Sequence, residues 1–508
     1  MAFRSLRDFL DRLERAGELV RVRDRVDLEL DMAAMADRAA KQGGPALLFE
    51  KPSGGELPVA MNLFGTRRRA AWALSCEDLQ EPADELRALL KTAPPQGLWE
   101  KLKMIPRLGR LASMGPRRVG SAAVQEVVRR GDEADLGALP VLTTWPHDGG
   151  PFITLPQVIT RDPETGLRNV GMYRLQVLGA RKLAMHWQLH KTATAHYRGY
   201  KKRGERMPVA IALGGDPALT YCASAPLPPG IDEYLFAGFL RKEAVHLARG
   251  VTVDLEVPAD ADVVIEGFVD PAAPLVREGP FGDHTGYYSL ADDYPFLEVT
   301  AVTRRADAVY PATVVGPPPM EDYWMGVATE RLFLPMLQLV FPEVVDMAFP
   351  PEGVFHNLCF LSIKKEFPGH AKKLMHGLWG SGQMSATKTL VVFDDDVDVH
   401  DFSQCAWRAF ANGDARRDLV VVEGPVDVLD HASPAFGLGA KIGVDATRKW
   451  AEEGGREWPE PCVHPPEVLA RADALYQRLV PGAPKPRRPR IAPPPAASWK
   501  PPSGGILQ

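Results

Sequence analysis

The chain has 508 residues, which is too long for one ordinary hydrophobic core and predicts about two to four domains. Its apolar fraction of 45% and charged fraction of 25% are typical of a globular protein that folds in water. A formal net charge of −5 and a pI near 6.2 give no reason to expect nucleic acid or an anionic membrane as the main partner.

The N-terminus and the cysteines predict a cytoplasmic protein. The opening stretch MAFRSLRDFLDRLERAGELVRV is charged throughout and lacks the apolar core of a signal peptide, and no run approaches the ~18 apolar residues of a membrane span. It predicts an amphipathic helix instead. The apolar face of that helix consists of Leu6, Phe9, Leu10 and Leu13. Five scattered cysteines without a Cys-X-X-Cys pair indicate a reducing compartment and argue against a cysteine zinc site.

Residues 1–115 predict an N-terminal α/β region. Two apolar runs, PALLFE and LPVAMNL, read as strands, and a second helical run follows at 80–104. The basic, glycine-rich stretch LGRLASMGPRRVG at 108–120 marks the boundary with the next region.

Residues 116–320 predict a mainly β domain, either a barrel or a sandwich. Short alternating or apolar runs recur between turn residues. These runs include FITLPQVIT, NVGMYRLQVLG, KLAMHWQL, PVAIALGG and PFLEVTAVTRR. We expect one helix to interrupt the strands, at 232–243.

Residues 321–465 predict a C-terminal α/β domain, because strands and helices alternate there. The expected helices are 322–340 and 370–380, and the expected strands are NLCFLSIKK, TLVVFDDDVDV and DLVVVEGPVDVLD. A C-terminal helix is predicted at 466–480 with Pro466 in its first turn. The tail at 481–508 is proline-rich and basic, so we expect it to be extended or disordered.

The stretch REGPFGDHTGYY places two carboxylates around a glycine- and proline-bent segment. Glu278 and Asp283 are five residues apart, so they cannot lie one above the other on a helix. Gly279, Pro280 and Gly282 suit a tight turn. If the segment folds back, both acids reach one cavity; if it does not, they face water on a surface turn.

A second informative stretch is RNVGMYRLQVLGARKLAMHWQLHKTATAHY. Arg174 lies in an alternating run and is expected to project from a strand, with Asn169 on the opposite face unless Gly171 bends that strand. His186 and His190 are four residues apart, a spacing at which two histidines on a helix can bind one metal ion. The residues around them alternate between apolar and polar as in a strand, however, and the motif His-Glu-X-X-His is absent. A lone histidine is more often structural.

Three other features have ordinary explanations. Glu233 opens a predicted helix, where an acid is favoured by the helix dipole. The acidic run DDDVDVHD at 394–401 lacks the glycine and terminal glutamate of a calcium loop, so we expect a solvated turn. The glycine-rich run GLGAKIGVDATRKW at 437–450 carries Lys441 but does not match a phosphate-binding loop.

Taken together, these stretches resemble the UbiD family of prenylated-flavin-dependent decarboxylases. The resemblance runs from LRDFLDRLERAGELVRV to REW, and its longest matches are EGPFGDHTGYY, PPEGVFHNL, KKEFPGHAKK and ASPAFGLGAKIGVDAT. It implies an α+β or α/β multidomain fold in which 116–320 forms a split-barrel flavin-binding domain. It also implies non-oxidative decarboxylation of an aromatic acid, a quinone precursor such as 4-hydroxy-3-polyprenylbenzoate.

The resemblance assigns catalytic roles to Arg174, Glu278 and Asp283. It implies that Asp283 donates the proton, that Glu278 is its partner near the cofactor, and that Arg174 organises both. The residue types suit this chemistry, because a carboxylic acid beside a second carboxylate in a dry pocket has a raised pKa. Such an acid can hold the proton that replaces CO2 and deliver it.

The resemblance also implies prenylated FMN with Mn²⁺ or Mg²⁺, and K⁺ as a further candidate ion. The implied metal ligands are Asn169, Glu233 and His190, whose oxygen and imidazole donors suit such a cation. The implied flavin contacts are Met172, Tyr173, Arg174, His186, Trp187, Gln188, Lys191 and Thr192. Where relatives read Arg-Trp-Leu-Ser-His-Arg-Gly, this chain reads HWQLHKT, and Lys191 keeps the charge but not the bidentate fork of arginine.

Several alternatives stay open at this point. The substrate is a polyprenylbenzoate or a naphthoate of menaquinone synthesis. A metal-dependent hydrolase using His186, His190 and an acid, and a non-catalytic flavin-binding or assembly protein, are rivals of other classes. Implied partners are a flavin prenyltransferase as cofactor supplier, a second copy in a homo-oligomer (dimer or hexamer), and the inner membrane, approached peripherally through a lipophilic substrate.

The run PPPMEDYWMGVATERLFLPMLQLVF at 317–341 contributes a further alternative. Its apolar side chains, including Trp324 and Phe333, either form ordinary helix core or roof a substrate cleft between two domains.

Overall fold

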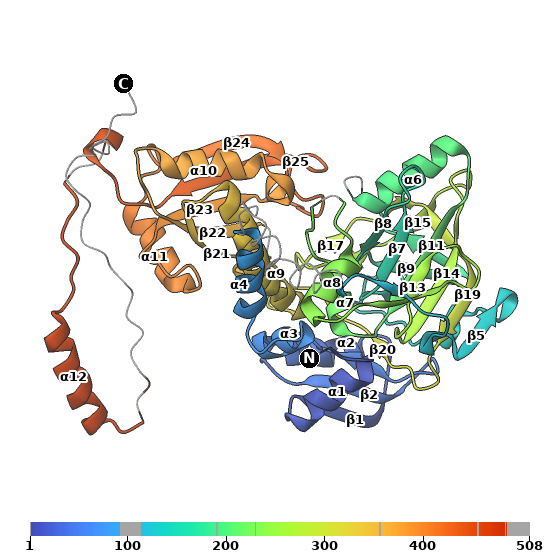
Figure 1. The fold of residues 1–508 in the computed structure, drawn as a ribbon. Coiled ribbons are helices and arrows are strands. Elements are labelled where there is room, and N and C mark those ends of the chain that lie inside the picture. The colour runs from blue at the N-terminus through green and yellow to red at the C-terminus, as the bar shows by residue number, and fades with distance from the viewer. Residues whose placement is uncertain are drawn as a thin grey trace, which may run out of the picture. The chain divides into compact units, whose positions relative to one another are not determined.

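The computed structural model describes residues 2–91, 113–188, 191–228, 230–354, 357–454, 457–482 and 484 (Figure 1). The chain divides into two compact units, Met1–Phe333 and Leu334–Gln508, and each is described by itself. Within the described ranges, no helix is both long enough and apolar enough to cross a membrane.

The first unit begins with a four-stranded sheet covered by helices. The strand order is β1-β2-β3-β20. The strands are β1 (Leu19–Val26), β2 (Ala46–Pro52), β3 (Val59–Met61) and β20 (Tyr310–Pro311). The helices are α1 (Leu6–Arg15), α2 (Asp31–Lys41), α3 (Arg67–Ala73) and α4 (Gln80–Leu90). The second predicted helical run therefore exists as α4, and its remainder at 92–104 lies outside the described residues.

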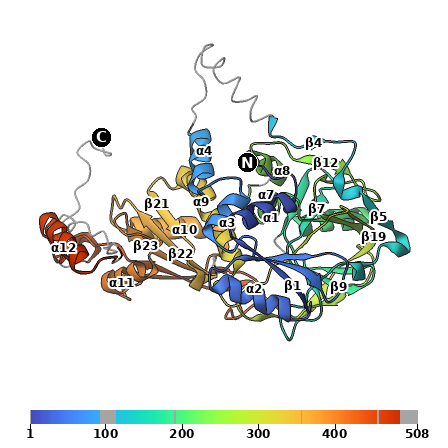
Figure 2. The same ribbon diagram turned by 90° about the horizontal axis from the view of Figure 1, so that it is seen from below.

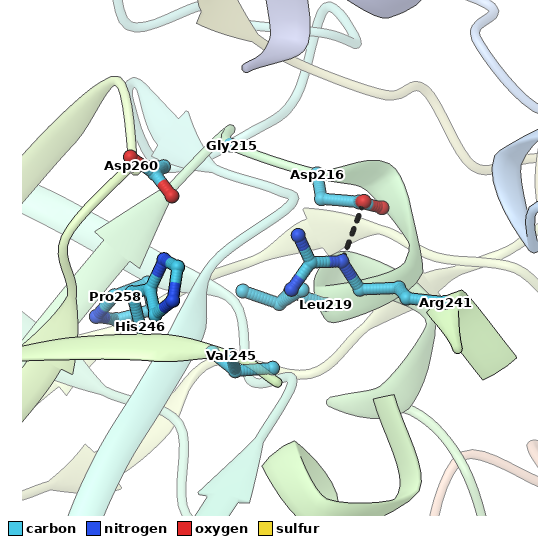
Figure 3. A pocket seen from close by; sticks show the side chains of 8 residues that line it. All are labelled: Gly215, Asp216, Leu219, Arg241, Val245, His246, Pro258 and Asp260. Atoms are coloured by element: carbon cyan, nitrogen blue, oxygen red, sulfur yellow. Dashed lines mark hydrogen bonds and ion pairs between the residues drawn. The ribbon is translucent and has the colours of Figure 1, made fainter. Parts of the chain in front are cut away.

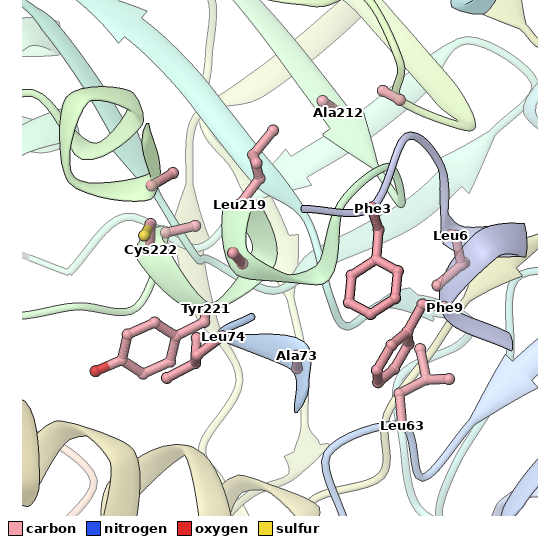
Figure 4. Packing of buried hydrophobic residues seen from close by; sticks show 14 of the residues in the cluster. Phe3, Leu6, Phe9, Leu63, Ala73, Leu74, Ala212, Leu219, Tyr221 and Cys222 are labelled. Carbon is pink, nitrogen blue, oxygen red and sulfur yellow. The ribbon is translucent and has the colours of Figure 1, made fainter. Parts of the chain in front are cut away.

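Helix α1 confirms the amphipathic pattern of the sequence. The Ser5 side chain accepts a hydrogen bond from the Asp8 backbone N–H, which satisfies one of the free donors of the first turn. The four apolar residues of the predicted face are all buried. Figure 4 shows Phe3, Leu6 and Phe9 packed near Leu63 of the N-terminal region. The N-terminal layer and the β domain thus share one core.

The centre of the first unit is a nine-stranded sheet that curls into a half-barrel (Figures 1 and 2). Its order is β6-β9-β10-β19-β14-β11-β7-β8, β5 pairs with β19, and all neighbouring pairs are antiparallel. The strands are β5 (Val127–Arg130), β6 (Phe152–Ile153), β7 (Gln157–Arg161), β8 (Arg168–Gly171), β9 (Leu175–Gly179), β10 (Lys182–Met185), β11 (Met207–Leu213), β14 (Val263–Val269) and β19 (Phe296–Arg304). A mainly β central domain is therefore confirmed.

Among the described residues, three helices accompany this sheet, although the sequence predicted one. They are α6 (Thr192–Arg203), α7 (Pro217–Cys222) and α8 (Glu233–Arg241), of which only α8 was expected. Helix α6, TATAHYRGYKKR, has little apolar periodicity. Helix α7 is short and buried along its whole length, so it presents no polar face to reveal a helical period.

Smaller strands and turns complete the first unit. One small sheet has the order β13-β12-β4, and two strand pairs, β15 with β18 and β16 with β17, carry the turn that contains the two acids. The strands are β4 (Arg117–Arg118), β12 (His246–Arg249), β13 (Glu256–Pro258), β15 (Val276–Glu278), β16 (Phe281–Gly282), β17 (Tyr288–Ser289) and β18 (Asp292–Tyr294). The 3₁₀ helices are Ala123–Gln125, Gly131–Glu133 and Leu136–Ala138.

A cavity of about 10 Å³ lies behind α7, room for about one water molecule. Figure 3 shows Asp216 and Arg241 pointing toward one another at this cavity, where Arg241 Nε donates to Asp216 Oδ2 at 2.7 Å. The same carboxylate oxygen accepts the Phe3 backbone N–H at 2.9 Å. This buried ion pair therefore ties down the N-terminal segment rather than forming a ligand site.

Helix α9 (Glu321–Val340) continues the chain from the first unit into the second. Its first part carries Met325 and Leu332, which are buried in the core of the first unit. Tyr323, Trp324 and Phe333 are partly buried and pack against the same core. These contacts favour the helix-core alternative for Trp324 and Phe333.

The second unit is a five-stranded mixed sheet with the order β21-β22-β23-β25-β24. The strands are β21 (Val344–Ala348), β22 (Leu358–Ile363), β23 (Thr389–Asp394), β24 (Leu419–Pro425) and β25 (Leu438–Asp445). The helices are α10 (His370–Trp379), α11 (Phe402–Asn412) and α12 (Pro466–Leu479), with 3₁₀ helices at Pro351–Gly353, Gly382–Ala386 and Ala451–Glu453. Strands β22, β23 and β25 run parallel, which confirms the α/β prediction.

Two runs that the sequence singled out lie in the second unit. Leu438–Asp445 of the glycine-rich run form β25, and Lys441 donates to the Ser385 carbonyl oxygen. The acidic run at 394–401 turns at the end of β23, as expected. Asp394 is buried, however, whereas a solvated residue was expected, and its carboxylate accepts a hydrogen bond from Arg448 Nε at 3.1 Å. Of the tail predicted at 481–508, the structure describes only residues 481, 482 and 484.

Candidate active site

Arg174 lies in the connection between β8 and β9, not within a strand as its alternating run predicted. The chain turns there because Tyr173 folds back over Gly171. A Cβ at Gly171 would lie 2.3 Å from the Tyr173 hydroxyl oxygen, which no side chain could tolerate. The turn directs the Arg174 side chain into the protein, where only 8% of it is exposed.

The Arg174 guanidinium joins the two acids of the glycine–proline turn. Its Nε and Nη2 donate to Glu278 Oε1 at 2.8 Å and Oε2 at 3.1 Å, and its Nη1 donates to Asp283 Oδ2. Such a bidentate, charge-assisted pair fixes the geometry of both groups. The guanidinium also lies 4.9 Å from the centre of the Phe281 ring, a cation–π contact. The turn thus folds back, the first of the two alternatives that the sequence left open.

Three hydrogen bonds hold the turn in this shape. Gly279, at φ +87°, adopts a conformation that favours glycine, and its N–H donates to Gln176 Oε1 at 2.8 Å. The Pro280 carbonyl oxygen accepts the Gly149 N–H at 2.7 Å. The Gly282 N–H, directly before Asp283, donates to Asp148 Oδ1 at 2.8 Å.

Asp148 belongs to a segment at 144–149 that we call the clamp segment. Its second oxygen, Oδ2, accepts the Thr144 N–H at 3.0 Å, the Thr144 hydroxyl at 2.8 Å and the Trp145 N–H at 2.9 Å. The Trp145 ring packs so closely that a Cβ at Gly282 would lie 2.2 Å from it. Asp148 therefore links the clamp segment to the backbone that carries Asp283.

Two histidines contact the acids, one on each carboxylate. His186 follows the end of β10, and its Nδ1 lies 3.1 Å from Glu278 Oε2, while its ring centre lies 4.5 Å from that of Tyr294 in a tilted contact. His284 Nδ1 and backbone N–H lie 2.9 Å and 2.8 Å from Asp283 Oδ1. No role was predicted from the sequence for His284, Tyr294 or Asp148. Only His284 offered a signal there, its position beside Asp283.

The charge state of the two acids differs from the sequence-based expectation. Burial is the largest influence on the pKa of Asp283 and raises it, but the hydrogen bond and charge of His284 and the charge of Arg174 outweigh burial. The pKa of Asp283 therefore lies well below its usual range. The pKa of Glu278 is lowered as well, because hydrogen bonds from His186 and Arg174 outweigh its burial. In the ligand-free protein both acids are ionised, so the predicted raised pKa is wrong for this state.

Two of the three residues implied as metal ligands lie close to each other. Glu233 is the first residue of α8, and its Oε2 accepts the N–H of Val170, the residue after Asn169, at 3.0 Å. Burial raises the pKa of Glu233 to about 7. His190 lies outside the described residues. Among the residues that the structure does describe, no three His, Cys, Asp or Glu side chains gather as a metal centre.

Three buried polar atoms near these groups have no hydrogen-bond partner among the described residues. They are Asn169 Nδ2, His186 Nε2 and Trp187 Nε1. A buried polar atom without a partner costs about 1–3 kcal/mol, so native proteins rarely keep one without a reason. All three belong to residues that the sequence had linked to flavin or metal. The donor set therefore fits a polar ligand bound here.

The remaining predicted flavin contacts surround the same region. Tyr173 is buried, and Met172 is partly buried with its N–H donated to the Ala223 carbonyl oxygen at 2.8 Å. Gln188 accepts the Lys191 N–H through its carbonyl oxygen at 3.1 Å. Lys191 caps the N-terminus of α6, and Thr192 is the first residue of that helix; both are exposed.

Comparison with known proteins places this architecture in a class of enzymes that remove CO2. The chain matches the domains of 3-octaprenyl-4-hydroxybenzoate carboxy-lyase, namely the N-terminal domain at 10–90, the Rift-related domain at 117–318 and the C-terminal domain at 323–446. These matches cover more than half of the chain, and they show that the protein belongs to the UbiD family. It is a carboxy-lyase, and the hydrolase alternative falls away.

Relatives and solved structures agree with this assignment over almost the whole chain. Uncharacterized proteins of Aquifex aeolicus and Archaeoglobus fulgidus are 50% and 47% identical, each over 94% of this chain and 99% of the relative. The UbiD-class enzyme HmfF of Pelotomaculum thermopropionicum, solved with FMN, is 31% identical with a TM-score of 0.77, over 92% of this chain and 99% of that one. Vanillic acid decarboxylase of Sedimentibacter hydroxybenzoicus in closed form is 26% identical with a TM-score of 0.81, over 94% and 99%.

Proposed function

We propose that this protein decarboxylates an aromatic carboxylic acid without net oxidation, using prenylated FMN and a divalent cation. One observation carries the proposal: a buried arginine joins two carboxylates, and buried polar atoms beside them have no hydrogen-bond partner among the described residues. The solved relative HmfF, whose structure holds FMN in one form and prenylated FMN in another, supports the choice of cofactor.

We propose that the flavin contacts run from Met172 to Arg174 and from His186 to Thr192. Lys191 and the N-terminus of α6 suit the flavin phosphate, because free backbone N–H groups and the helix dipole favour an anion there. Asn169, Glu233 and His190 would hold Mn²⁺ or Mg²⁺ against that phosphate, and K⁺ remains a further candidate ion. When bound, prenylated FMN would accept the electron pair that the departing CO2 leaves behind.

The chain's own residues would supply the proton that replaces CO2. The substrate carboxylate brings another negative charge to a site where Arg174 already serves Glu278 and Asp283. Like charge raises a carboxyl pKa, so binding should return Asp283 toward its protonated form. Asp283 then delivers the proton to the carbon that lost CO2, and Glu278 holds Arg174 in place. His284, 2.9 Å from the other oxygen of Asp283, is placed to resupply the proton.

Membership of the UbiD family indicates an aromatic acid as the substrate. The known members do not indicate which aromatic acid it is. Vanillic acid decarboxylase is named for a small aromatic acid. We propose a quinone precursor, with 4-hydroxy-3-polyprenylbenzoate first and a naphthoate of menaquinone synthesis as the second candidate. We also propose a cytoplasmic homo-oligomer, a dimer or hexamer, supplied with cofactor by a flavin prenyltransferase and approaching the inner membrane only through a lipophilic substrate.

The decisive experiment purifies the protein after co-expression with a flavin prenyltransferase. An absorbance spectrum shows whether flavin is bound, and CO2 release is measured from benzoates, a polyprenylbenzoate and a naphthoate. We expect bound flavin and CO2 release from at least one of these acids. Flavin loading without CO2 release from any of them would favour the non-catalytic flavin-binding alternative.

A further inference from the structure

His186 is a buried residue whose two ring nitrogens have different surroundings. The side chain is 9% exposed, and its ring centre lies 4.5 Å from that of Tyr294. Nδ1 lies 3.1 Å from Glu278 Oε2, whereas Nε2 is buried without a hydrogen-bond partner among the described residues. Nδ1 is therefore hydrogen-bonded within the protein, whereas Nε2 is free to bind a ligand.

The contact with Glu278 determines which nitrogen carries the hydrogen. Glu278 binds Arg174 through both oxygens and is ionised, so it can only accept hydrogen bonds. Nδ1 must then be the N–H donor. Burial, the largest influence, lowers the pKa of His186, so the ring is neutral and has only one N–H. Nε2 consequently presents a lone pair.

We propose that His186 Nε2 is a specificity-determining acceptor, and that the molecule bound in the active site must place an N–H or O–H group against it. This inference rests on the proposed function for the identity of that molecule. Two sources supply such a donor: a ring N–H of the flavin, or a phenolic hydroxyl of a hydroxylated aromatic acid. If the bound molecule has no N–H or O–H group at this position, Nε2 stays buried and unpaired in the complex. The cost of that unpaired nitrogen makes such a molecule bind more weakly.

Two substitutions separate the two nitrogens of His186. In His186→Asn, the amide N–H₂ group falls near the position of Nδ1, so the donor to Glu278 is kept and the acceptor is lost. In His186→Gln, the longer amide reaches the position of Nε2, so an acceptor is kept and the contact with Glu278 is lost. Thermal melting checks that both variants fold. Each variant is thus the matched control of the other.

Both readouts measure binding, so neither depends on turnover. FMN is titrated into flavin-free protein and followed by flavin fluorescence. Benzoate and its 2-, 3- and 4-hydroxy forms are titrated into FMN-loaded protein by calorimetry. A lost hydrogen bond should weaken binding about tenfold. We expect His186→Asn to lose either FMN affinity or the preference for one hydroxylated acid over benzoate, and His186→Gln to retain it.

The outcomes identify the donor or overturn the proposal. Weaker FMN binding in His186→Asn alone assigns the donor to the flavin, and a lost hydroxyl preference in that variant alone assigns it to the substrate. Wild-type behaviour of His186→Asn in both titrations would overturn the proposal. Equal losses in both variants, or a loss in His186→Gln alone, would also overturn it, because the contact with Glu278 would then be what matters. If CO2 release fails while these titrations succeed, the proposed function fails and the acceptor stands.

Discussion

Each unit of the molecule contains a buried cluster of charged residues, and the two clusters differ in how completely their hydrogen bonds are satisfied. In the second unit, Lys449 donates to the Asp445 carbonyl oxygen at 2.9 Å, to Asp445 Oδ1 at 3.0 Å and to the Thr447 carbonyl oxygen at 2.5 Å. Lys365 donates to Thr447 Oγ1 at 3.0 Å, to the Arg448 carbonyl oxygen at 2.7 Å and to Glu453 Oε2 at 2.6 Å. Each ammonium has three donors, so both lysines are saturated.

The cluster around Arg174 in the first unit is equally buried but incomplete. Arg174 satisfies Glu278 and Asp283, yet the nearby His186 and its neighbour Trp187 each keep a buried polar atom without a partner among the described residues. A saturated network rigidifies a fold, whereas an unsaturated one stores a cost that a ligand can remove. Buried charge alone therefore does not mark an active site here. Among the described residues, single unpaired atoms such as Tyr310 Oη and Arg408 Nε occur elsewhere in both units, so what distinguishes the Arg174 cluster is that unpaired atoms of two neighbouring residues lie beside joined carboxylates.

The largest expected effect is on turnover, in the unsaturated cluster. Asp283→Asn keeps the shape of the side chain but cannot deliver a proton, so CO2 release by the flavin-loaded enzyme should fall about 10²–10⁴-fold while flavin stays bound. Asp293→Asn, an exposed acid of β18, is the control and should leave turnover unchanged. Undiminished CO2 release by Asp283→Asn would remove this residue from the mechanism.

In the cluster around Lys449 and Lys365, a substitution should lower the stability of the protein and leave turnover unchanged. Lys449→Met leaves Asp445 buried without its hydrogen-bonded cation, while Asp418 keeps Arg417. Breaking a buried pair in this way costs about 3–5 kcal/mol. Denaturant unfolding should show the loss, while the turnover of the protein that remains folded is unchanged. Lys364→Met, at an exposed position of the same unit, should cost almost nothing. Similar stability for both variants would mean that saturation contributes little.

A smaller effect is expected where the clamp segment meets the turn. Asp148→Ala removes the acceptor for the Gly282 N–H and frees the backbone before Asp283. A misplaced catalytic group slows chemistry more than binding, so kcat should fall about 10- to 100-fold with little change in KM. Asp148→Asn keeps one acceptor oxygen and should recover much of that loss. A rise in KM with kcat unchanged would show that Asp148 shapes the binding pocket instead.

The smallest effect concerns acid stability. Glu278 and Asp283 have a lower pKa in the folded protein than in the unfolded chain, so the folded state binds fewer protons. Their contribution to stability is present above about pH 4 and is lost as the pH falls below that value. The melting temperature of Asp283→Asn should therefore fall less steeply between pH 5 and pH 3 than that of the wild type. Parallel curves would mean that Asp283 is not held ionised in the fold.

Much of the fold could be predicted because its pattern is local. The apolar face of α1 and the alternating runs of the half-barrel are readable from spacing alone. Helix α7 was missed because a fully buried helix has no polar face, and Arg174 was placed on a strand because the close contact of Tyr173 with Gly171 is invisible in sequence. Local pattern reports periodicity, not packing.

The structure brings together the residues that the sequence named for the candidate site, but their electrostatics differ from the expectation. Glu278, Asp283 and Arg174 could be named from motifs, but a raised pKa was expected from burial and like charge alone. The hydrogen bonds of His186 and His284 reverse that balance, and the sequence does not give their distances. Asp148 was missed because it lies far along the chain from the turn it holds.

The most direct test of the central claim is a crystal structure of this protein with FMN and Mn²⁺ bound. We predict that FMN lies beside Arg174 and that His186 Nε2, Trp187 Nε1 and the Asn169 amide each gain a partner from the flavin, the metal or a water bound with them. FMN bound elsewhere, with these three groups still buried and unpaired, would contradict the claim that the unpaired groups beside Arg174 belong to the active site.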